Sequence, residues 1–170
     1  MWTIIEPPFP PLKGMAPIVA ADFDPNRRAL ALKMGADIAV DPREHSPYEP
    51  LSGLGSHRVN LVYECVGKAG LLHQMMTSVG FGARIVVGGF CLEPEQIYVA
   101  AGQTKGLKII FATGERPEDM ALAVRSIADN RIDVRPWLGA RIGLAGVEDA
   151  LMKMNDPASP VRTVVNPRAI

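Results

Sequence analysis

Few residues of this sequence have the types and spacing that chemistry requires. The histidines, His45, His57 and His73, fall in two predicted loops and a predicted helix, so they form no ligand cluster along the chain. The two cysteines, Cys65 and Cys91, lie in a predicted strand and just after another, where thiols are commonly buried. No Ser-His-Asp or paired-carboxylate arrangement is evident. The sequence therefore predicts neither a catalytic residue nor a metal site.

Asp22 is the acidic side chain with the most informative position. It follows the uncharged run 17–21, which is typical of a strand buried on both faces. Asp24 and Pro25 then supply an N-cap and a first helical residue, and Gly35 a left-handed helix stop. In a dinucleotide-binding fold, the acidic residue that ends the second strand holds the ribose hydroxyls of NAD. Asp22 occupies that position.

Strands and amphipathic helices alternate along the rest of the chain. Strands are predicted at 36–40, 59–67, 83–89, 107–111 and 161–165, and helices at 69–79, from 117 onward and at 147–154. This alternation predicts an α/β fold, a Rossmann-like, doubly wound and mostly parallel sheet. Ligands bind beyond the carboxyl ends of such strands. Glycines at two of these ends are explained equally well by turn geometry and by close approach of a ligand.

The glycine-rich fingerprint that holds a dinucleotide pyrophosphate is absent. It normally precedes the ribose-binding acid by about twenty residues, yet Gly14 is the only glycine before Asp22. Gly80 and Gly82 lie between a helix and the following strand, the reverse of the order that a phosphate loop needs. We therefore expect a sheet truncated at its N-terminus. Residues 1–11 form a Pro-rich segment, a tether or a partner-binding element, and residues 12–170 a partial dinucleotide-binding domain with a C-terminal helix and strand.

Composition excludes several classes of function. The chain has 170 residues, of which 48% are hydrophobic and 21% charged, as expected of a globular domain rather than a disordered one. Its formal net charge is zero, so no overall field attracts nucleic acid or an anionic membrane. The sequence contains neither a signal-peptide pattern nor an apolar run of membrane-spanning length. These features predict a soluble, cytoplasmic protein.

From about residue 12 to residue 168 the chain resembles the C-terminal, NAD-binding half of a zinc-type medium-chain alcohol dehydrogenase. The segments that carry the resemblance, in order and spacing, are 16–25 with Arg27, 34–37, 63–67, 85–89 and 162–165. The catalytic domain of that family precedes this region and supplies cysteine and histidine ligands to zinc. The present sequence contains no such ligands, so zinc is expected in the family but not in this chain.

The resemblance implies a set of cofactor-binding residues, none of them catalytic. They are Asp22, Arg27, Val66, Gly67, Val87, Gly88, Gly89, Phe111 and Arg162. By this resemblance Asp22 and Arg27 bind the adenosine ribose, and Arg162 approaches the pyrophosphate. The other residues lie near the adenine, the nicotinamide ring and its carboxamide. Because the Asp22 carboxylate repels a 2′-phosphate, NAD is implied rather than NADP, although the neighbouring arginines weaken the preference.

Three functions remain open at this stage. The chain is a truncated or degenerate dehydrogenase that is inactive alone, an active subunit completed by a separate catalytic chain, or a non-enzymatic module for dimerisation or nucleotide binding. Dimerisation would use the edge strand near Leu107–Phe111, whose unpaired backbone groups can accept a second copy. The sequence does not decide whether the chain is an enzyme.

Overall fold

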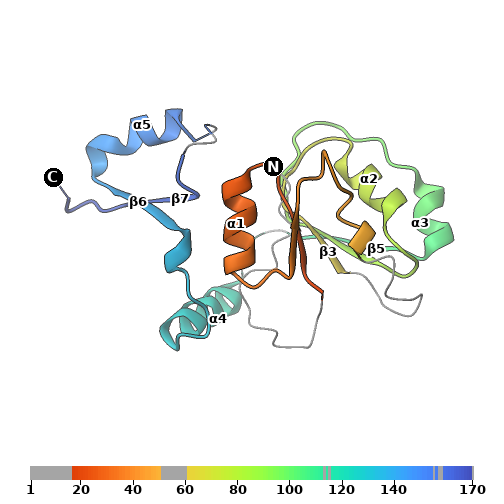
Figure 1. Ribbon diagram of the computed structural model, residues 1–170, viewed down its shortest axis with the longest axis horizontal. Coiled ribbons are helices and arrows are strands. Elements are labelled where there is room, and N and C mark those ends of the chain that lie inside the picture. Colours follow the sequence, from red (N-terminus) through yellow and green to blue (C-terminus); the bar gives the residue numbers. More distant parts are fainter. Residues whose placement is uncertain are drawn as a thin grey trace. The chain divides into compact units, whose positions relative to one another are not determined.

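The computed structural model describes residues 17–50, 61–112, 114, 116–154, 156 and 159–169. The chain divides into two compact units, residues 1–122 and 123–170, and each is described by itself (Figure 1). The Pro-rich segment predicted at residues 1–11 lies outside the described residues.

The first unit begins with strand β1 (Val19–Ala21), helix α1 (Pro25–Lys33) and strand β2 (Ile38–Val40). β1 and β2 pair in parallel, and α1 contacts both strands. The N-cap prediction is confirmed, because the Asp24 carboxylate accepts a hydrogen bond from the N–H of Asn26 at 2.8 Å. The helix stop is confirmed as well, because Gly35 has a φ of 104°. The residues of β1 are 0–6% exposed, as expected of a strand covered on both faces.

Three more strands of the first unit form a second parallel sheet. Strands β3 (Leu61–Glu64), β4 (Arg84–Val87) and β5 (Lys108–Phe111) pair in the order β3-β4-β5, with helix α2 (Leu71–Ser78) between β3 and β4 and helix α3 (Val99–Lys105) between β4 and β5. The core forms where the predicted apolar stripe of α2 packs on this sheet. Its buried members are Val62, Leu71, Leu72, Met75, Met76, Val79, Ala83 and Ile85.

The two sheets correspond to two parts of a doubly wound sheet. In the strand order 3-2-1-4-5-6, strands 2 and 3 lie on one side of the first strand and strands 4 to 6 on the other. The pair β1-β2 and the trio β3-β4-β5 match these two blocks in number, order and parallel direction. Within the described part of the chain, no strand joins them. The predicted α/β class with parallel strands is therefore confirmed, as blocks rather than one continuous sheet.

Helix α4 (Pro117–Ala128) begins at the predicted proline and crosses from the first unit into the second. The second unit then contains two 3₁₀ turns, η2 (Arg135–Trp137) and η3 (Leu144–Gly146), helix α5 (Val147–Met152), and the parallel strands β6 (Leu138–Ile142) and β7 (Arg162–Val165). The predictions of α5 and β7 are confirmed, whereas α3 and β6 were not predicted. None of the described helices is long and apolar enough to span a membrane.

Candidate cofactor-binding edge

Most of the predicted site residues lie at one edge of the β3-β4-β5 sheet. The register aligns Glu64 with Val87 and Val87 with Phe111, so three parallel strands end at the same level. The turns after these strands contain the predicted residues Val66, Gly67, Gly88 and Gly89. Because ligands of α/β sheets bind beyond the carboxyl ends of strands, this edge is the candidate site in the first unit.

Glu64 connects the turns of this edge. Glu64 is 3% exposed, and its Oε1 accepts hydrogen bonds from the N–H of Val66 at 2.6 Å and from the N–H of Gly67 at 2.8 Å. Its backbone carbonyl accepts the N–H of Gly88 at 2.7 Å and of Gly89 at 2.8 Å. Glu64 lies in the segment 63–67 that carries the family resemblance, but the sequence predicts no role for it. Its bonds to Gly88 and Gly89 depend on the register of β3 against β4.

Gly67 and Gly89 are required by the close packing of the two turns. Gly67 has a φ of 69°, and a Cβ atom there would lie 2.6 Å from backbone atoms of Phe90. A Cβ atom on Gly89 would lie 2.2 Å from the Gly67 nitrogen and 2.5 Å from Oε2 of Glu64. Contacts this short cannot be relieved without moving backbone. Packing of one turn against the other therefore explains these two glycines.

Cys65 lies between Glu64 and Val66 in this edge. Burial, followed by the charge of the neighbouring Glu64, raises the pKa of the Cys65 thiol. A raised pKa keeps the thiol protonated near neutral pH, and a protonated thiol is a poor nucleophile. The environment of Cys65 thus gives no support to a nucleophilic role.

Asp22 ends β1, as the sequence predicts, and is only 5% exposed. Its Oδ1 accepts the N–H of Asp24 at 2.8 Å, so the carboxylate also orders the turn into α1. Arg27 lies in the first turns of α1 and forms an ion pair with Asp24, with 3.6 Å between Nε and Oδ2. Asp22, directly after β1, and Arg27, in α1, therefore both lie around the start of α1 and not in the turns after β3, β4 and β5.

A charge network lies beside Asp22 that the sequence did not predict. Asp41, 5% exposed, accepts a hydrogen bond from Nη1 of Arg28 at 3.0 Å and from Nε of Arg43 at 2.8 Å. The side-chain hydrogen bond from Arg43 holds the pKa of Asp41 well below its ordinary value. Arg28 also donates to the backbone carbonyls of Asp22 and Phe23 at 2.8 and 3.0 Å. These arginines are engaged by carboxylate and carbonyl oxygens.

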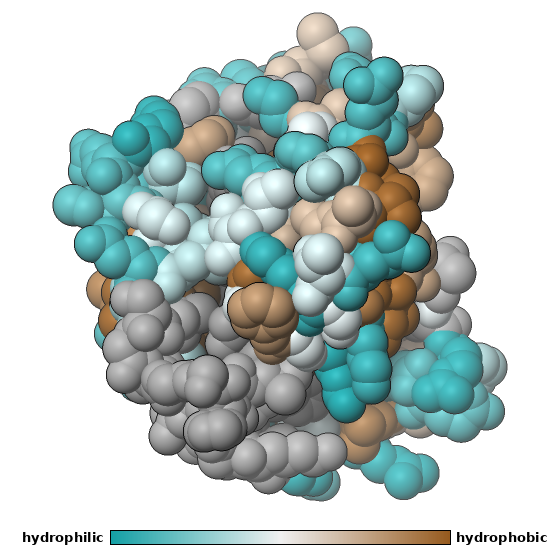
Figure 2. Space-filling view, turned by 90° about the vertical axis from the view of Figure 1, so that its right-hand side faces the viewer, coloured by the Kyte–Doolittle hydropathy of each residue, from teal (hydrophilic) through white to brown (hydrophobic). Residues whose placement is uncertain are grey.

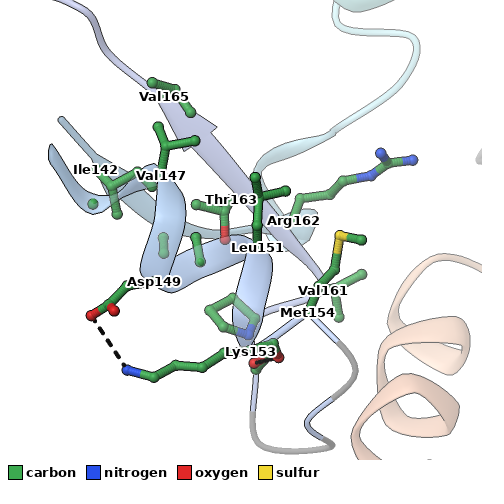
Figure 3. Close-up of a pocket in the computed structure, with 15 residues that line it drawn as sticks. Ile142, Val147, Asp149, Leu151, Lys153, Met154, Val161, Arg162, Thr163 and Val165 are labelled. Atoms are coloured by element: carbon green, nitrogen blue, oxygen red, sulfur yellow. Dashed lines mark hydrogen bonds and ion pairs between the residues drawn. The ribbon is translucent and has the colours of Figure 1, made fainter. Parts of the chain in front are cut away.

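Arg162, predicted near the pyrophosphate, lies in β7 of the second unit. This strand borders a cavity of about 510 Å³ between α5, β6 and β7, lined mostly by aliphatic side chains (Figure 3). The guanidinium of Arg162 extends outward, on the side opposite the ion pair of Asp149 and Lys153, whose atoms Oδ2 and Nζ are 3.7 Å apart.

The residues at the strand ends suit a dinucleotide better than a zinc ion. In the described ranges, no three His, Cys, Asp or Glu side chains gather closely enough to hold a metal ion, so these residues do not fit zinc. The strand ends do fit a dinucleotide in part. They combine a carboxylate on Asp22 with exposed backbone turns, whereas no glycine-rich phosphate loop precedes Asp22 in the sequence.

Comparison with known proteins identifies the family. Residues 12–129 match the family model described as zinc-binding dehydrogenase. The chain belongs to this family. The match confirms the resemblance on which the cofactor-binding residues were predicted, while the role of each residue stays a prediction.

Relatives of this dehydrogenase family are considerably longer than the chain. L-threonine 3-dehydrogenase of Symbiobacterium thermophilum is 27% identical over 160 residues, which are 92% of this chain and 46% of that protein. A short chain alcohol dehydrogenase of Escherichia coli CFT073, complexed with NADH, superposes with a TM-score of 0.73 at 18% identity, over 87% of this chain and 44% of the other. A zinc-binding dehydrogenase of Sinorhizobium meliloti 1021, bound to NADP, gives 0.76 at 23% identity, over 92% and 46%. The chain therefore spans less than half of each and resembles their cofactor-binding part.

Proposed function

We propose that this chain is the NAD-binding half of a zinc-dependent dehydrogenase and is inactive as an alcohol dehydrogenase by itself. The supporting observation is the common carboxyl edge at which β3, β4 and β5 end. Of the solved structures that resemble this chain, one is complexed with NADH and another is bound to NADP. Residues 12–170 form the partial dinucleotide-binding domain in this proposal.

In this proposal Asp22 binds the adenosine ribose and Arg27 lies close to it. Val66 and Gly67 flank the adenine and nicotinamide side, and the turn 87–89 offers its backbone to the nicotinamide carboxamide. Phe111 lies near the nicotinamide ring, and Arg162 approaches the pyrophosphate. Asp22 favours NAD over NADP because its carboxylate would repel a 2′-phosphate. Arg28 uses its Nη1 for Asp22 O, Phe23 O and Asp41, and the Asp41 carboxylate compensates part of its charge, so it offsets that repulsion less. When bound, NAD supplies a hydride acceptor; the described residues supply its binding surface.

Calorimetry of the full chain with NADH tests the proposal. We expect weak binding dominated by the adenosine half, because the glycine-rich pyrophosphate loop is absent from the sequence. AMP should therefore retain most of the binding free energy of NADH, and NADPH should bind less well. Asp22→Asn keeps an oxygen for the Asp24 N–H but removes the charge, and should weaken NADH binding by about tenfold.

Two results would contradict this proposal. Equal affinity for NADH in the wild type and in Asp22→Asn would remove Asp22 from the site. Alcohol-dependent NADH formation by the isolated, zinc-loaded chain would disprove its inactivity. NADH formation only after a separate catalytic domain is added would instead support a subunit completed by another chain.

A dimerisation module is the second candidate function, and the exposure of β5 favours it. Within the described residues, β5 is bonded only to β4, and Ile110 and Phe111 are 51% and 69% exposed. An edge strand with exposed apolar side chains can pair with a second copy across a two-fold axis. Dimerisation is compatible with cofactor binding, because it would use the open side of β5, whereas the cofactor would lie beyond the carboxyl ends of the strands.

A further inference from the structure

Glu64 uses both its side chain and its backbone at the candidate edge. The carboxylate takes the N–H groups of Val66 and Gly67, and the carbonyl takes those of Gly88 and Gly89. A carboxylate that is 3% exposed loses most of its hydration, and hydrogen bonds from backbone N–H groups offset that loss. One residue thus orders the turns after two neighbouring strands.

The two turns leave almost no freedom for this arrangement to relax. A Cβ atom on Gly89 would overlap both the Gly67 nitrogen, at 2.2 Å, and Oε2 of Glu64, at 2.5 Å. A shift of the Glu64 side chain would therefore move the turn of Val66 and Gly67 and, through it, the turn at Gly89. The packing couples the positions of the turns to one carboxylate.

Hydrogen bonding to Glu64 also determines what the edge can offer a ligand. The N–H groups of Val66, Gly67, Gly88 and Gly89 are all occupied. No described residue donates to the carbonyls of Gly67 and Gly89. At these four residues the edge therefore offers carbonyl acceptors rather than N–H donors, which suits a ligand group that carries N–H donors.

We propose that Glu64 is the positioning residue of the cofactor-binding edge, holding the turns at Val66–Gly67 and Gly88–Gly89 with their carbonyls free to accept from a ligand. This inference rests on the proposed function. Glu64 acts through the turns and does not itself contact the cofactor. Its carboxylate is required as an acceptor of two N–H groups, so an amide oxygen at the same position should replace it only in part.

The test compares Glu64→Gln with Asp41→Asn in the full chain. Asp41 is the matched control, because it is also a buried carboxylate but lies in the β1-β2 part of the first unit. Amide hydrogen exchange should rise about tenfold at Val66 and Gly67 in Glu64→Gln, which corresponds to weakening a charge-assisted hydrogen bond. Exchange at Ala112, whose N–H bonds to Val87 in the β4-β5 ladder, should stay unchanged. Asp41→Asn should leave exchange at Val66 and Gly67 as in the wild type.

Calorimetry separates a positioning role from a merely structural one. With both variants folded at the assay temperature, Glu64→Gln should weaken NADH binding several-fold more than AMP binding. Wild-type exchange at Val66 and Gly67 in Glu64→Gln would overturn the proposal, as would equal losses for NADH and AMP. If the wild type binds no NADH, the proposed function fails, whereas the exchange result still decides whether Glu64 holds the turns.

Discussion

Asp41 is the residue at which charge contributes most clearly to folding. It is 5% exposed and accepts hydrogen bonds from the side chains of Arg28 and Arg43 and from the Arg43 N–H at 3.0 Å. Arg43 also lies over the Phe23 ring, with its Cζ 4.9 Å from the centroid. The Arg28 side chain is 23% exposed, so removal of the Asp41 charge leaves a partly buried guanidinium less well compensated. The charge of Asp41 should therefore matter to stability.

Asp41→Asn should lower the free energy of unfolding at pH 7, and its effect should shrink at acid pH. The side-chain hydrogen bond from Arg43 depresses the pKa of Asp41 in the folded chain below the unfolded value of about 4. The stabilisation is therefore complete above about pH 4 and is lost as the pH falls toward the folded pKa. Urea unfolding at pH 7 and pH 3 should show the variant and the wild type converging.

Asp133→Asn provides an exposed comparison. Asp133 forms a similar pair with Arg135, with 2.7 Å between Oδ1 and Nε, but both side chains are about half exposed or more. Solvent screening should make this substitution nearly neutral at pH 7. A loss of stability for Asp41→Asn that is the same at both pH values would show that the replacement of one acceptor oxygen by an NH2 group, and not the loss of charge, is what matters.

At the scale of elements, α2 ends without a left-handed glycine. Its C-cap, Val79, is extended, with φ −70° and ψ 157°. Lys105, the last residue of α3, instead supplies its ammonium to the carbonyls of Met76, Thr77 and Val79 at 3.2, 2.6 and 2.8 Å. A cation at the C-terminus of a helix satisfies carbonyls that lack an intrahelical partner and interacts favourably with the helix dipole. Lys105 thereby joins α3 to the core helix.

Lys105→Met should therefore destabilise the chain by about 1–2 kcal/mol, the loss expected for charge-assisted bonds to partly exposed carbonyls. Lys33→Met is the matched control, since Lys33 also lies in the last turn of a helix but is exposed. Its effect should stay below about 1 kcal/mol. Chemical unfolding of both variants checks the difference, and equal losses would mean that the ammonium contacts add nothing beyond the dipole.

The elements that build the core were predictable from the sequence, because each has a buried face. The buried residues Leu72, Met76 and Val79 of α2 recur at helical spacing, and β1 reads as an uncharged run. By contrast α3 contains no buried residue, and β6 (Leu138–Ile142) is exposed or half-buried throughout. Neither produces a hydrophobic period. Amphipathicity thus predicted the elements that build the core. Among the elements without a buried residue, α5 and β7 were predicted, whereas α3 and β6 were missed.

The candidate site was predictable to a similar extent. Strand ends follow from the strands themselves, so Asp22 and the residues after β3 and β4 were located correctly along the chain. The bonds of Glu64 to Gly88 and Gly89 join residues more than twenty positions apart and depend on the register of two strands. The Asp41 network likewise needs α1 folded against β2. Composition and spacing do not contain this information.

At the scale of the whole molecule, β5 is an outer strand among the described residues, and a second copy could pair with its open side. The N–H groups of Lys108 and Ala112 bond to β4, at 3.0 Å to Ala83 and 2.8 Å to Val87. Because backbone groups alternate along a strand, those of Ile109 and Phe111 point to the open edge. Exposed hydrophobic residues also lie among hydrophilic ones on the face in Figure 2. An antiparallel pairing of two β5 strands would occupy the open groups and cover exposed apolar surface.

Light scattering after size exclusion should therefore give a mass twice that of the 18.3 kDa chain. Phe111→Pro removes an N–H on the open edge and leaves the ladder to β4 intact, so it should convert the dimer to a monomer without unfolding it. Phe111→Leu keeps the N–H and an apolar side chain and should remain dimeric. A wild-type chain that is monomeric at every concentration would rule out pairing through β5. A dimer that survives Phe111→Pro would place the interface elsewhere, because a ladder around a two-fold axis loses two N–H donors with each such substitution.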